Sequence, residues 1–290
     1  MKTLATLALL TTALSAAPAF AEPDATAIAT YKDIEKTLGL VPTFFKAFPE
    51  EGIAAAWGEL KSVQLNPTTA LSGKTKELIS VAIAGQIPSR YCSYLHTELA
   101  KLNGASDGEL KDAIAMAAIT RHWSTELNGL QIDLGEFKQE LSRIVAYVKK
   151  PTATGLAPLV VDAASAYKDI EYTFGFVPTF LRRFPESGIV AGWGELKSVE
   201  LNPKTRLSGK QKELIGLAVA AQIPCQYCVA LHTEVAKLNG ASDQEIREAV
   251  AVASISRHWS TVLNGALIDE VQFRKEIDQI ITNAKKSAKR

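Results

Sequence analysis

The residues with the clearest chemical potential lie in the string PCQYCVALH, residues 224–232. Cys225, Cys228 and His232 are spaced i, i+3 and i+7, so on a helix they share one face within an arc of roughly 60°. A thiolate is a nucleophile and an imidazole moves protons near neutral pH, so this spacing predicts thiol redox chemistry. Pro224 suits the first turn of a helix, where free amides and the helix dipole would favour a thiolate.

A carboxylate stands twelve residues before the first of these cysteines. Glu213 begins an apolar stretch, residues 213–223, whose composition predicts a helix buried on most faces. An antiparallel return from that helix would bring Glu213 beside His232. There the carboxylate would orient the imidazole and raise its basicity.

Three other roles are open to the two thiols. A structural disulfide is disfavoured, because a C-x-x-C loop is too short to constrain much of the unfolded chain. Zinc binding by Cys225, Cys228 and His232 is chemically allowed but lacks a fourth ligand at a recognised spacing. Inert buried thiols are the remaining alternative. We therefore expect no metal, and no bound cofactor either, because the G-x-G-x-x-G dinucleotide motif is missing from the sequence.

The chain contains the same pattern twice. A shift of 136 residues aligns residues 31–140 with 167–276 without gaps, and 72 of the 110 positions are identical. The counterparts of the four site residues are Glu77, Ser89, Cys92 and His96. Ser89 cannot form a disulfide, so Cys92 either is oxidised and awaits an external thiol or belongs to a degenerate scaffold. We favour the scaffold.

Helix signals surround both copies. Capping boxes and glycine C-caps predict helix starts near residues 209 and 243, and a short turn between antiparallel helices. The strand alternation typical of sheets is not sustained anywhere, so we expect an all-α protein made of two tandem helical bundles. The signals are Ser208/Gln211, Ser242/Glu245, Ser106/Glu109, residues 237–240 and Asn103-Gly104.

These patterns divide the chain into five segments. Residues 1–21 have the charged start, apolar run and A-x-A end of a secretory signal peptide, and polar interruptions argue against a retained membrane anchor. Repeat 1 is predicted over 22–148, a linker over 149–164, repeat 2 over 165–284 and a basic tail over 285–290. We expect a periplasmic or secreted protein with no membrane contact after cleavage.

Composition narrows the function classes further. With 32 basic and 31 acidic residues the formal net charge is +1, which gives no field to attract nucleic acid or an anionic membrane. Three cysteines are too few for a disulfide framework. The hydrophobic fraction of 47% is typical of a packed globular protein.

The spacing E-x11-C-x2-C-x3-H, from Glu213 to His232, resembles the alkyl hydroperoxidase D branch of the carboxymuconolactone decarboxylase-like family. The resemblance implies an all-α fold, assembly as trimers or hexamers, and reduction of hydroperoxides or disulfide exchange with a partner dithiol. It also implies that Cys228 attacks the peroxide, that Cys225 resolves the sulfenic acid, and that His232 and Glu213 form a proton relay. One departure is Tyr227, which stands where that family can hold a second relay histidine.

A second repeated string, RHWSTxLNG, gives residues 121–129 and 257–265. We interpret its His-Trp pair mainly as an aromatic anchor with a core histidine. Alternatively, His258 and Trp259, together with Tyr227, line the substrate pocket or a subunit contact.

Three functions remain open at this level. The leading hypothesis is a thiol hydroperoxidase or disulfide reductase, which takes electrons from an external dithiol protein and assembles as a trimer of tandem chains. The second is a decarboxylase-like or lactone lyase enzyme that uses His232 and Glu213 as acid and base. The third is a non-catalytic oligomeric binding protein, in which the repeats only build a ring.

Overall fold

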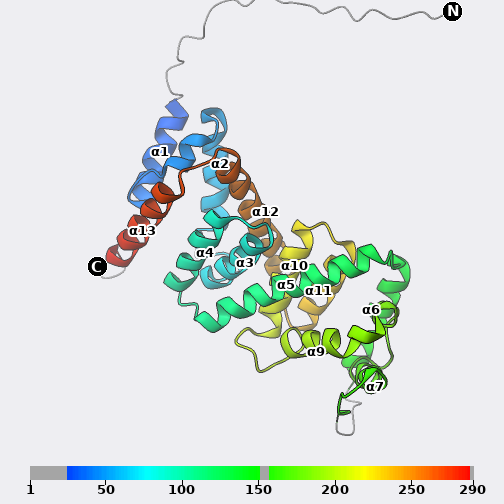
Figure 1. Ribbon diagram of the computed structural model, residues 1–290. Helices are drawn as coiled ribbons and strands as arrows, with labels where there is room; N and C mark the ends of the chain where they lie inside the picture. The colour runs from blue at the N-terminus through cyan, green and yellow to red at the C-terminus, as the bar shows by residue number, and fades with distance from the viewer. Residues whose placement is uncertain (1–24, 151–156, 288–290) are drawn as a thin grey trace, which may run out of the picture.

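The computed structural model describes residues 25–150 and 157–287. The predicted signal peptide lies outside these residues, as does part of the predicted linker. Within the described residues the chain forms thirteen α-helices, two short 3-10 helices and no strand (Figure 1). The all-α prediction is therefore confirmed. None of the described helices combines the length and the apolar character that crossing a membrane requires.

Each repeat contributes one series of helices. Repeat 1 forms α1 (Ala25–Leu38), η1 (Thr43–Ala47), α2 (Glu50–Val63), α3 (Gly73–Gln86), α4 (Arg90–Leu102), α5 (Asp107–Gly129) and α6 (Leu134–Val148). Repeat 2 forms α7 (Ala163–Phe174), α8 (Thr179–Arg183), η2 (Glu186–Gly188), α9 (Ile189–Val199), α10 (Gly209–Gln222), α11 (Gln226–Leu238), α12 (Asp243–Gly265) and α13 (Glu270–Ser287). Residues 285–287, which belong to the predicted basic tail, form the last turn of α13.

The predicted caps set the helix boundaries. Ser208 and Ser242 each accept a hydrogen bond from the third residue of the following helix, and a side chain there bonds back, which completes a capping box. The same box begins α5 at Ser106. Gly104 and Gly240 follow α4 and α11 with φ of +81°, a left-handed conformation that glycine adopts without a Cβ penalty. The helix starts predicted near residues 209 and 243 are confirmed.

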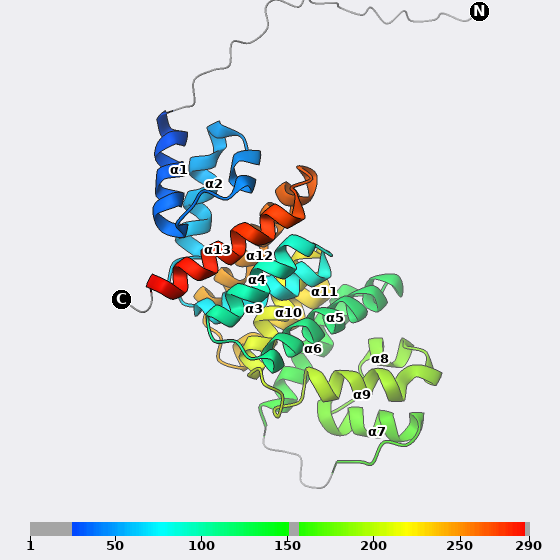
Figure 2. The ribbon, with the colours of Figure 1, turned by 60° about the vertical axis from the view of Figure 1, so that its left-hand side comes forward.

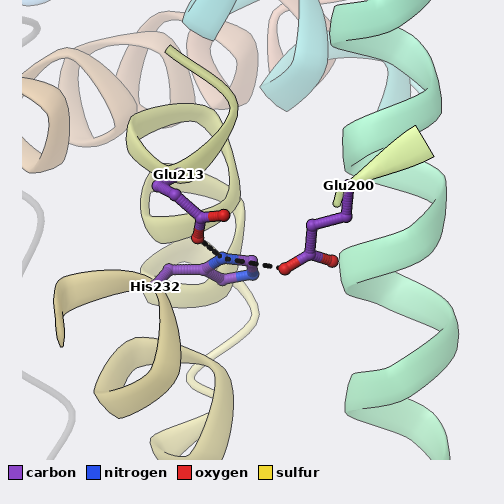
Figure 3. A group of neighbouring side chains, drawn as sticks. All are labelled: Glu200, Glu213 and His232. Carbon is purple, nitrogen blue, oxygen red and sulfur yellow. Dashed lines mark hydrogen bonds and ion pairs between the residues drawn. The ribbon is translucent and has the colours of Figure 1, made fainter. Parts of the chain in front are cut away.

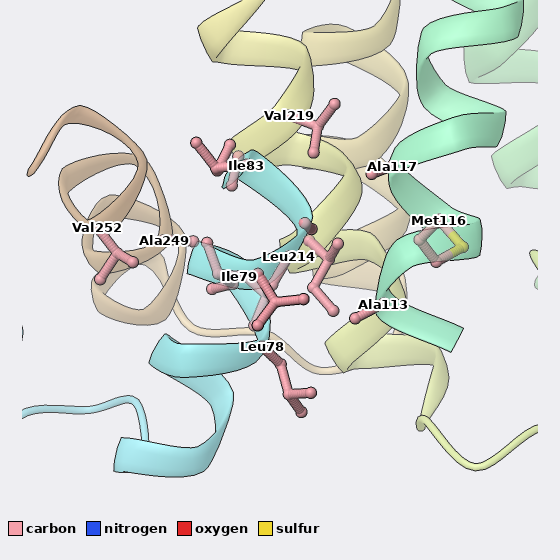
Figure 4. Close-up of a cluster of buried hydrophobic side chains, with 14 of the residues drawn as sticks. Leu78, Ile79, Ile83, Ala113, Met116, Ala117, Leu214, Val219, Ala249 and Val252 are labelled. Atoms are coloured by element: carbon pink, nitrogen blue, oxygen red, sulfur yellow. The ribbon is translucent and has the colours of Figure 1, made fainter. Parts of the chain in front are cut away.

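The core lies where the repeats meet. Helices α3 and α5 of repeat 1 pack against α10 and α12 of repeat 2, and their apolar side chains form one continuous cluster (Figure 4). Every residue of α10 from 212 to 220 is buried, as the sequence predicted for this helix. Replacing Leu214 or Met116 with alanine should lower the free energy of unfolding by roughly 2–5 kcal/mol in urea titrations, because both side chains are fully buried in this cluster.

The outer helices of each repeat cross over to the other repeat. Helices α1, η1 and α2 pack on α12 and α13, while α7 and α9 pack on α5 and α6. Both views show these groups at opposite ends of the molecule (Figures 1 and 2). Two equivalent hydrogen-bond pairs fix the crossing: the Thr43 amide donates to Glu276 at 3.0 Å, and the Thr179 amide to Glu140 at 2.9 Å. The two repeats therefore interlock and are not two separate bundles.

Candidate active site

The two cysteines of repeat 2 lie at the beginning of α11. Cys225 is the N-cap residue, and its Sγ accepts a hydrogen bond from the Cys228 amide at 3.3 Å. The two Sγ atoms are 2.6 Å apart, and both thiols are free and buried. Pro224 precedes the N-cap, so the expectation that it occupies the first turn of the helix is wrong. The predicted proximity of both thiols to a helix N-terminus is correct.

The surroundings of the two thiols separate their acidities. Hydrogen bonding with Cys228, opposed by burial and supported by Ser124, the Cys228 amide and Asn128, lowers the pKa of Cys225 to about 5. Its bond with Cys225, together with burial, raises the pKa of the Cys228 thiol. In the reduced pair, Cys225 therefore carries the negative charge and Cys228 keeps the proton.

His232 forms the predicted pair with Glu213. Its Nδ1 lies 2.8 Å from Glu213 Oε2, and both side chains are almost fully buried (Figure 3). Burial opposes protonation of the imidazole, but the carboxylate outweighs it, so the pKa of His232 is raised. Gly216 on α10 lies directly against the imidazole, since a Cβ there would contact the ring where it now stands.

Glu200 is a site residue that sequence reasoning missed. It is the C-cap of α9, and its Oε1 lies 3.9 Å from His232 Nδ1 (Figure 3). Glu200, Glu213 and His232 bring ligand atoms within 4.8 Å of one another, a donor set that also suits a divalent cation. The signal that could have found Glu200 is the repeat itself, since the first copy has Gln64 at the equivalent position.

Repeat 1 supplies the other side of the site through α5. Thr120 Oγ1 lies 3.3 Å from His232 Nε2, and the Asn128 amide donates to Cys225 Sγ at 3.5 Å. Asn128 belongs to the first RHWSTxLNG string, which thus contacts the thiols of the other repeat. Tyr227, on the same turn as the cysteines, donates to the Ile132 carbonyl at 2.6 Å and ties α11 to the end of α5.

A cavity of about 90 Å³ lies over Cys228 and His232. Its polar lining is limited to the site residues and one further carboxylate, and the remaining wall is apolar. Helices α5 and α6 of repeat 1 supply eight of the 18 lining residues, and the region from α7 to α9 closes the cavity. The lining residues are Ile119, Thr120, Trp123, Leu127, Phe137, Glu140, Leu141, Ile144, Phe174, Pro178, Phe180, Leu196, Glu200, Leu201, Cys228, Leu231, His232 and Val235.

The cavity of the intact site is not lined by His258, Trp259 or Tyr227, and the packing of the first two agrees with the favoured interpretation as an aromatic anchor. Helix α12 crosses to repeat 1, where Trp259 packs edge-on against Phe45 at 5.0 Å between ring centroids and His258 lies 5.1 Å from Phe48. The interlocking places the other copy of the motif, with Trp123, in the cavity wall. The sequence motif was informative, but the exchange of helices between repeats decides which site it serves.

The site of repeat 1 keeps its ion pair but not its thiol pair. His96 Nδ1 lies 2.7 Å from Glu77 Oε2, next to the buried Cys92. Ser89 takes the N-cap position of α4 and accepts a hydrogen bond from Asn264 at 3.2 Å. Asn264 corresponds to Asn128, so the sites of the two repeats have the same arrangement. They differ mainly in the N-cap residue, which is Ser89 in repeat 1 and Cys225 in repeat 2.

The pair in repeat 1 makes stability depend on pH. Burial lowers the pKa of His96, but the Glu77 carboxylate and Cys92 raise it by more, so the pKa is about 10. The folded-state pKa exceeds the unfolded one, so this contribution is complete below about pH 6.5 and is lost as pH rises through 10, at up to about 1.4 kcal/mol per pH unit. We expect the difference in unfolding free energy between wild type and Glu77→Gln to shrink from pH 7 to pH 10 in urea titrations. A constant difference would contradict the raised pKa.

A tandem all-α fold with an acid–imidazole pair and a thiol pair buried between its repeats defines the class of this protein. The model of the carboxymuconolactone decarboxylase family matches residues 51–133 and 189–269, and the chain belongs to this family. A comparison with curated proteins gives no significant match.

Among solved structures, the chain is similar to one described as a gamma-carboxymuconolactone decarboxylase subunit from Burkholderia xenovorans LB400. The sequences are 16% identical, the alignment covers 91% of this chain and 98% of the other, and the TM-score is 0.53. At this identity the likeness establishes the fold alone.

Proposed function

We propose that the protein is a thiol-dependent hydroperoxidase, periplasmic or secreted, that uses the pair Cys225 and Cys228. The observation that carries this proposal is the placement of the two sulfurs. Cys228 lines the cavity beside His232, while Cys225 lies 2.6 Å behind it as the acidic N-cap. Cys228 can therefore contact a substrate in the cavity, while Cys225 can accept the Cys228 proton and later form the disulfide.

The reaction follows from this arrangement. When Cys228 attacks the terminal oxygen of a hydroperoxide, its proton passes to the Cys225 thiolate, and Cys228 becomes a sulfenic acid. Cys225 then displaces the hydroxyl group as water and forms the disulfide. A dithiol of another protein restores the reduced pair by thiol–disulfide exchange. Protonated His232, held by Glu213, stabilises negative charge that develops next to Cys228.

The cavity favours an organic hydroperoxide over hydrogen peroxide. Its wall is apolar except near the thiol, so burial of an alkyl or aryl group adds affinity at about 25 cal/mol per Å². Hydrogen peroxide has no such group and gains nothing from this surface.

We also propose a trimer of chains, because the interlocked repeats already make each chain a pseudo-dimer and the resemblance implies six units.

A second candidate function is a decarboxylase-like or lactone lyase reaction. The observation in its favour is the group Glu200, Glu213 and His232, which offers an acid and a base within one buried cluster at the same cavity. In that reaction the thiols would take no part, so loss of Cys228 separates the two functions.

A thiol count tests the proposal. Purified, reduced protein should lose two of its three free thiols when treated with cumene hydroperoxide, and react more slowly with hydrogen peroxide. Cys228→Ser should lose no thiol pair and turn over no hydroperoxide, whereas Cys92→Ser should still lose two thiols. Full retention of the thiols in the treated wild type would rule out the hydroperoxidase, and lactone turnover by Cys228→Ser would establish the lyase.

A further inference from the structure

The position of Glu200 is fixed by a buried lysine. Lys212, which is 1% exposed, donates hydrogen bonds to the carbonyls of Val199 at 2.9 Å, Glu200 at 3.1 Å and Asn202 at 2.6 Å. These bonds hold the end of α9 in place. The Glu200 side chain therefore reaches the same imidazole nitrogen that Glu213 contacts (Figure 3), and it lines the cavity together with Cys228.

The charges around Glu200 favour its protonated form. Burial raises its pKa first, and the Glu213 carboxylate raises it further, while His232 and Lys212 act in the opposite direction, so the pKa reaches about 7. His232 already binds Glu213 at 2.8 Å and is 3.9 Å from Glu200. Glu140, the carboxylate that α6 adds to the cavity, accepts a hydrogen bond from the Thr179 amide. Burial and the neighbouring carboxylate therefore favour a proton on Glu200, which the side chain can transfer into the cavity.

We propose that Glu200 is the general acid that protonates the leaving alkoxide when Cys228 attacks an organic hydroperoxide. This inference rests on the hydroperoxidase function proposed above. It adds a catalytic residue outside the E-x11-C-x2-C-x3-H pattern.

The atoms and electrons of the step balance. A bond forms between Cys228 Sγ and the terminal peroxide oxygen, which keeps its hydrogen, while the O–O bond breaks and its electron pair leaves with the alkoxide. Sulfur is oxidised to sulfenic acid and the peroxide is reduced to an alcohol. The Cys228 proton passes to Cys225, and the Glu200 proton passes to the alkoxide. Disulfide closure then releases water, and Glu200 takes a proton from solvent.

The repeat supplies a matched comparison. Gln64 replaces Glu200 in repeat 1, where its Nε2 donates to Glu77 at 2.8 Å and to Ser80 at 3.3 Å. A glutamine therefore fits this position in the fold, but it has no acidic proton to transfer. The substitution occurs in the same repeat that has serine in place of the resolving cysteine.

The test compares two leaving groups in the full-length protein. The rate of thiol loss is followed by stopped flow for wild type and Glu200→Gln, with cumene hydroperoxide and with a peroxy acid. An alkoxide is a strong base and needs a proton, whereas the carboxylate that leaves a peroxy acid does not. We expect Glu200→Gln to lower the rate of thiol loss with cumene hydroperoxide by about 100-fold or more at pH 6, and to lower the rate with the peroxy acid only a few-fold.

The pH dependence gives a second measurement. Wild type should lose rate with cumene hydroperoxide as pH rises through about 7, where Glu200 ionises, and Glu200→Gln should lack this decline. Gln64→Glu, the reciprocal change in repeat 1, should leave both rates as in wild type. Equal slowing of both substrates, or no slowing, would overturn the role of Glu200. If wild-type thiols do not react with hydroperoxide at all, the proposed function itself fails.

Discussion

Glu213→Gln should lower hydroperoxide turnover by about 10²- to 10⁴-fold and destabilise the protein by about 3 kcal/mol. The carboxylate supports the charge of a fully buried imidazole, and an amide cannot replace that support. His232 would become neutral and could no longer stabilise negative charge beside Cys228. Steady-state kinetics and urea unfolding at pH 7 would measure the two effects.

The degenerate site provides the control for this change. Glu77 forms the equivalent pair with His96 at 2.7 Å and is equally buried. Glu77→Gln should therefore reduce stability by a similar amount and leave turnover within about two-fold of wild type. If both variants lose turnover equally, the activity loss reflects general destabilisation, and the assignment of catalysis to repeat 2 is wrong.

Repeat 2 expressed alone, as residues 157–290, should form a homodimer and should not fold as a monomer. Without repeat 1, α10 and α11 lose the packing of α5 and α6, His232 loses its contact with Thr120, and Cys225 loses its hydrogen bond from Asn128. A second copy can replace them, because α12 offers Ser256 and Asn264 at the equivalent positions. Such an isologous dimer would hold two complete thiol sites.

Sedimentation and thiol titration would check this expectation. The dimer should lose four thiols to hydroperoxide, two from each site. Repeat 1 expressed alone over residues 25–150 is the matched control, since it can form the same dimer but has only Cys92 in each chain. A monomer of repeat 2 that unfolds cooperatively would show that the crossing helices are not needed for the fold.

Local signals in the sequence were sufficient for part of this structure. The capping boxes at Ser208 and Ser242 and the left-handed glycines are local, since each depends on residues within one or two turns. The pairing of Glu213 with His232 was also predictable, because it joins consecutive antiparallel helices. These features needed no knowledge of distant packing.

The composition of the site was not predictable in this way. Repeats that are 72 of 110 residues identical can pack their outer helices on themselves or on each other, and the local pattern is the same in both cases. In this structure the outer helices pack on the other repeat. Trp123 and Asn128 therefore lie at the site of repeat 2, and Trp259 does not. Glu200 was missed because it lies outside any motif, and only its difference from Gln64 distinguishes it.

The interlocking of the repeats also has an evolutionary consequence. In a homodimer, one gene encodes both halves of both active sites, so every mutation changes the two sites together. In this chain a mutation in α5 changes the site that has both thiols, and a mutation in α12 changes the site that has Ser89. Gene fusion thus releases each site from selection on the other, and allows one to lose its chemistry while the other keeps it.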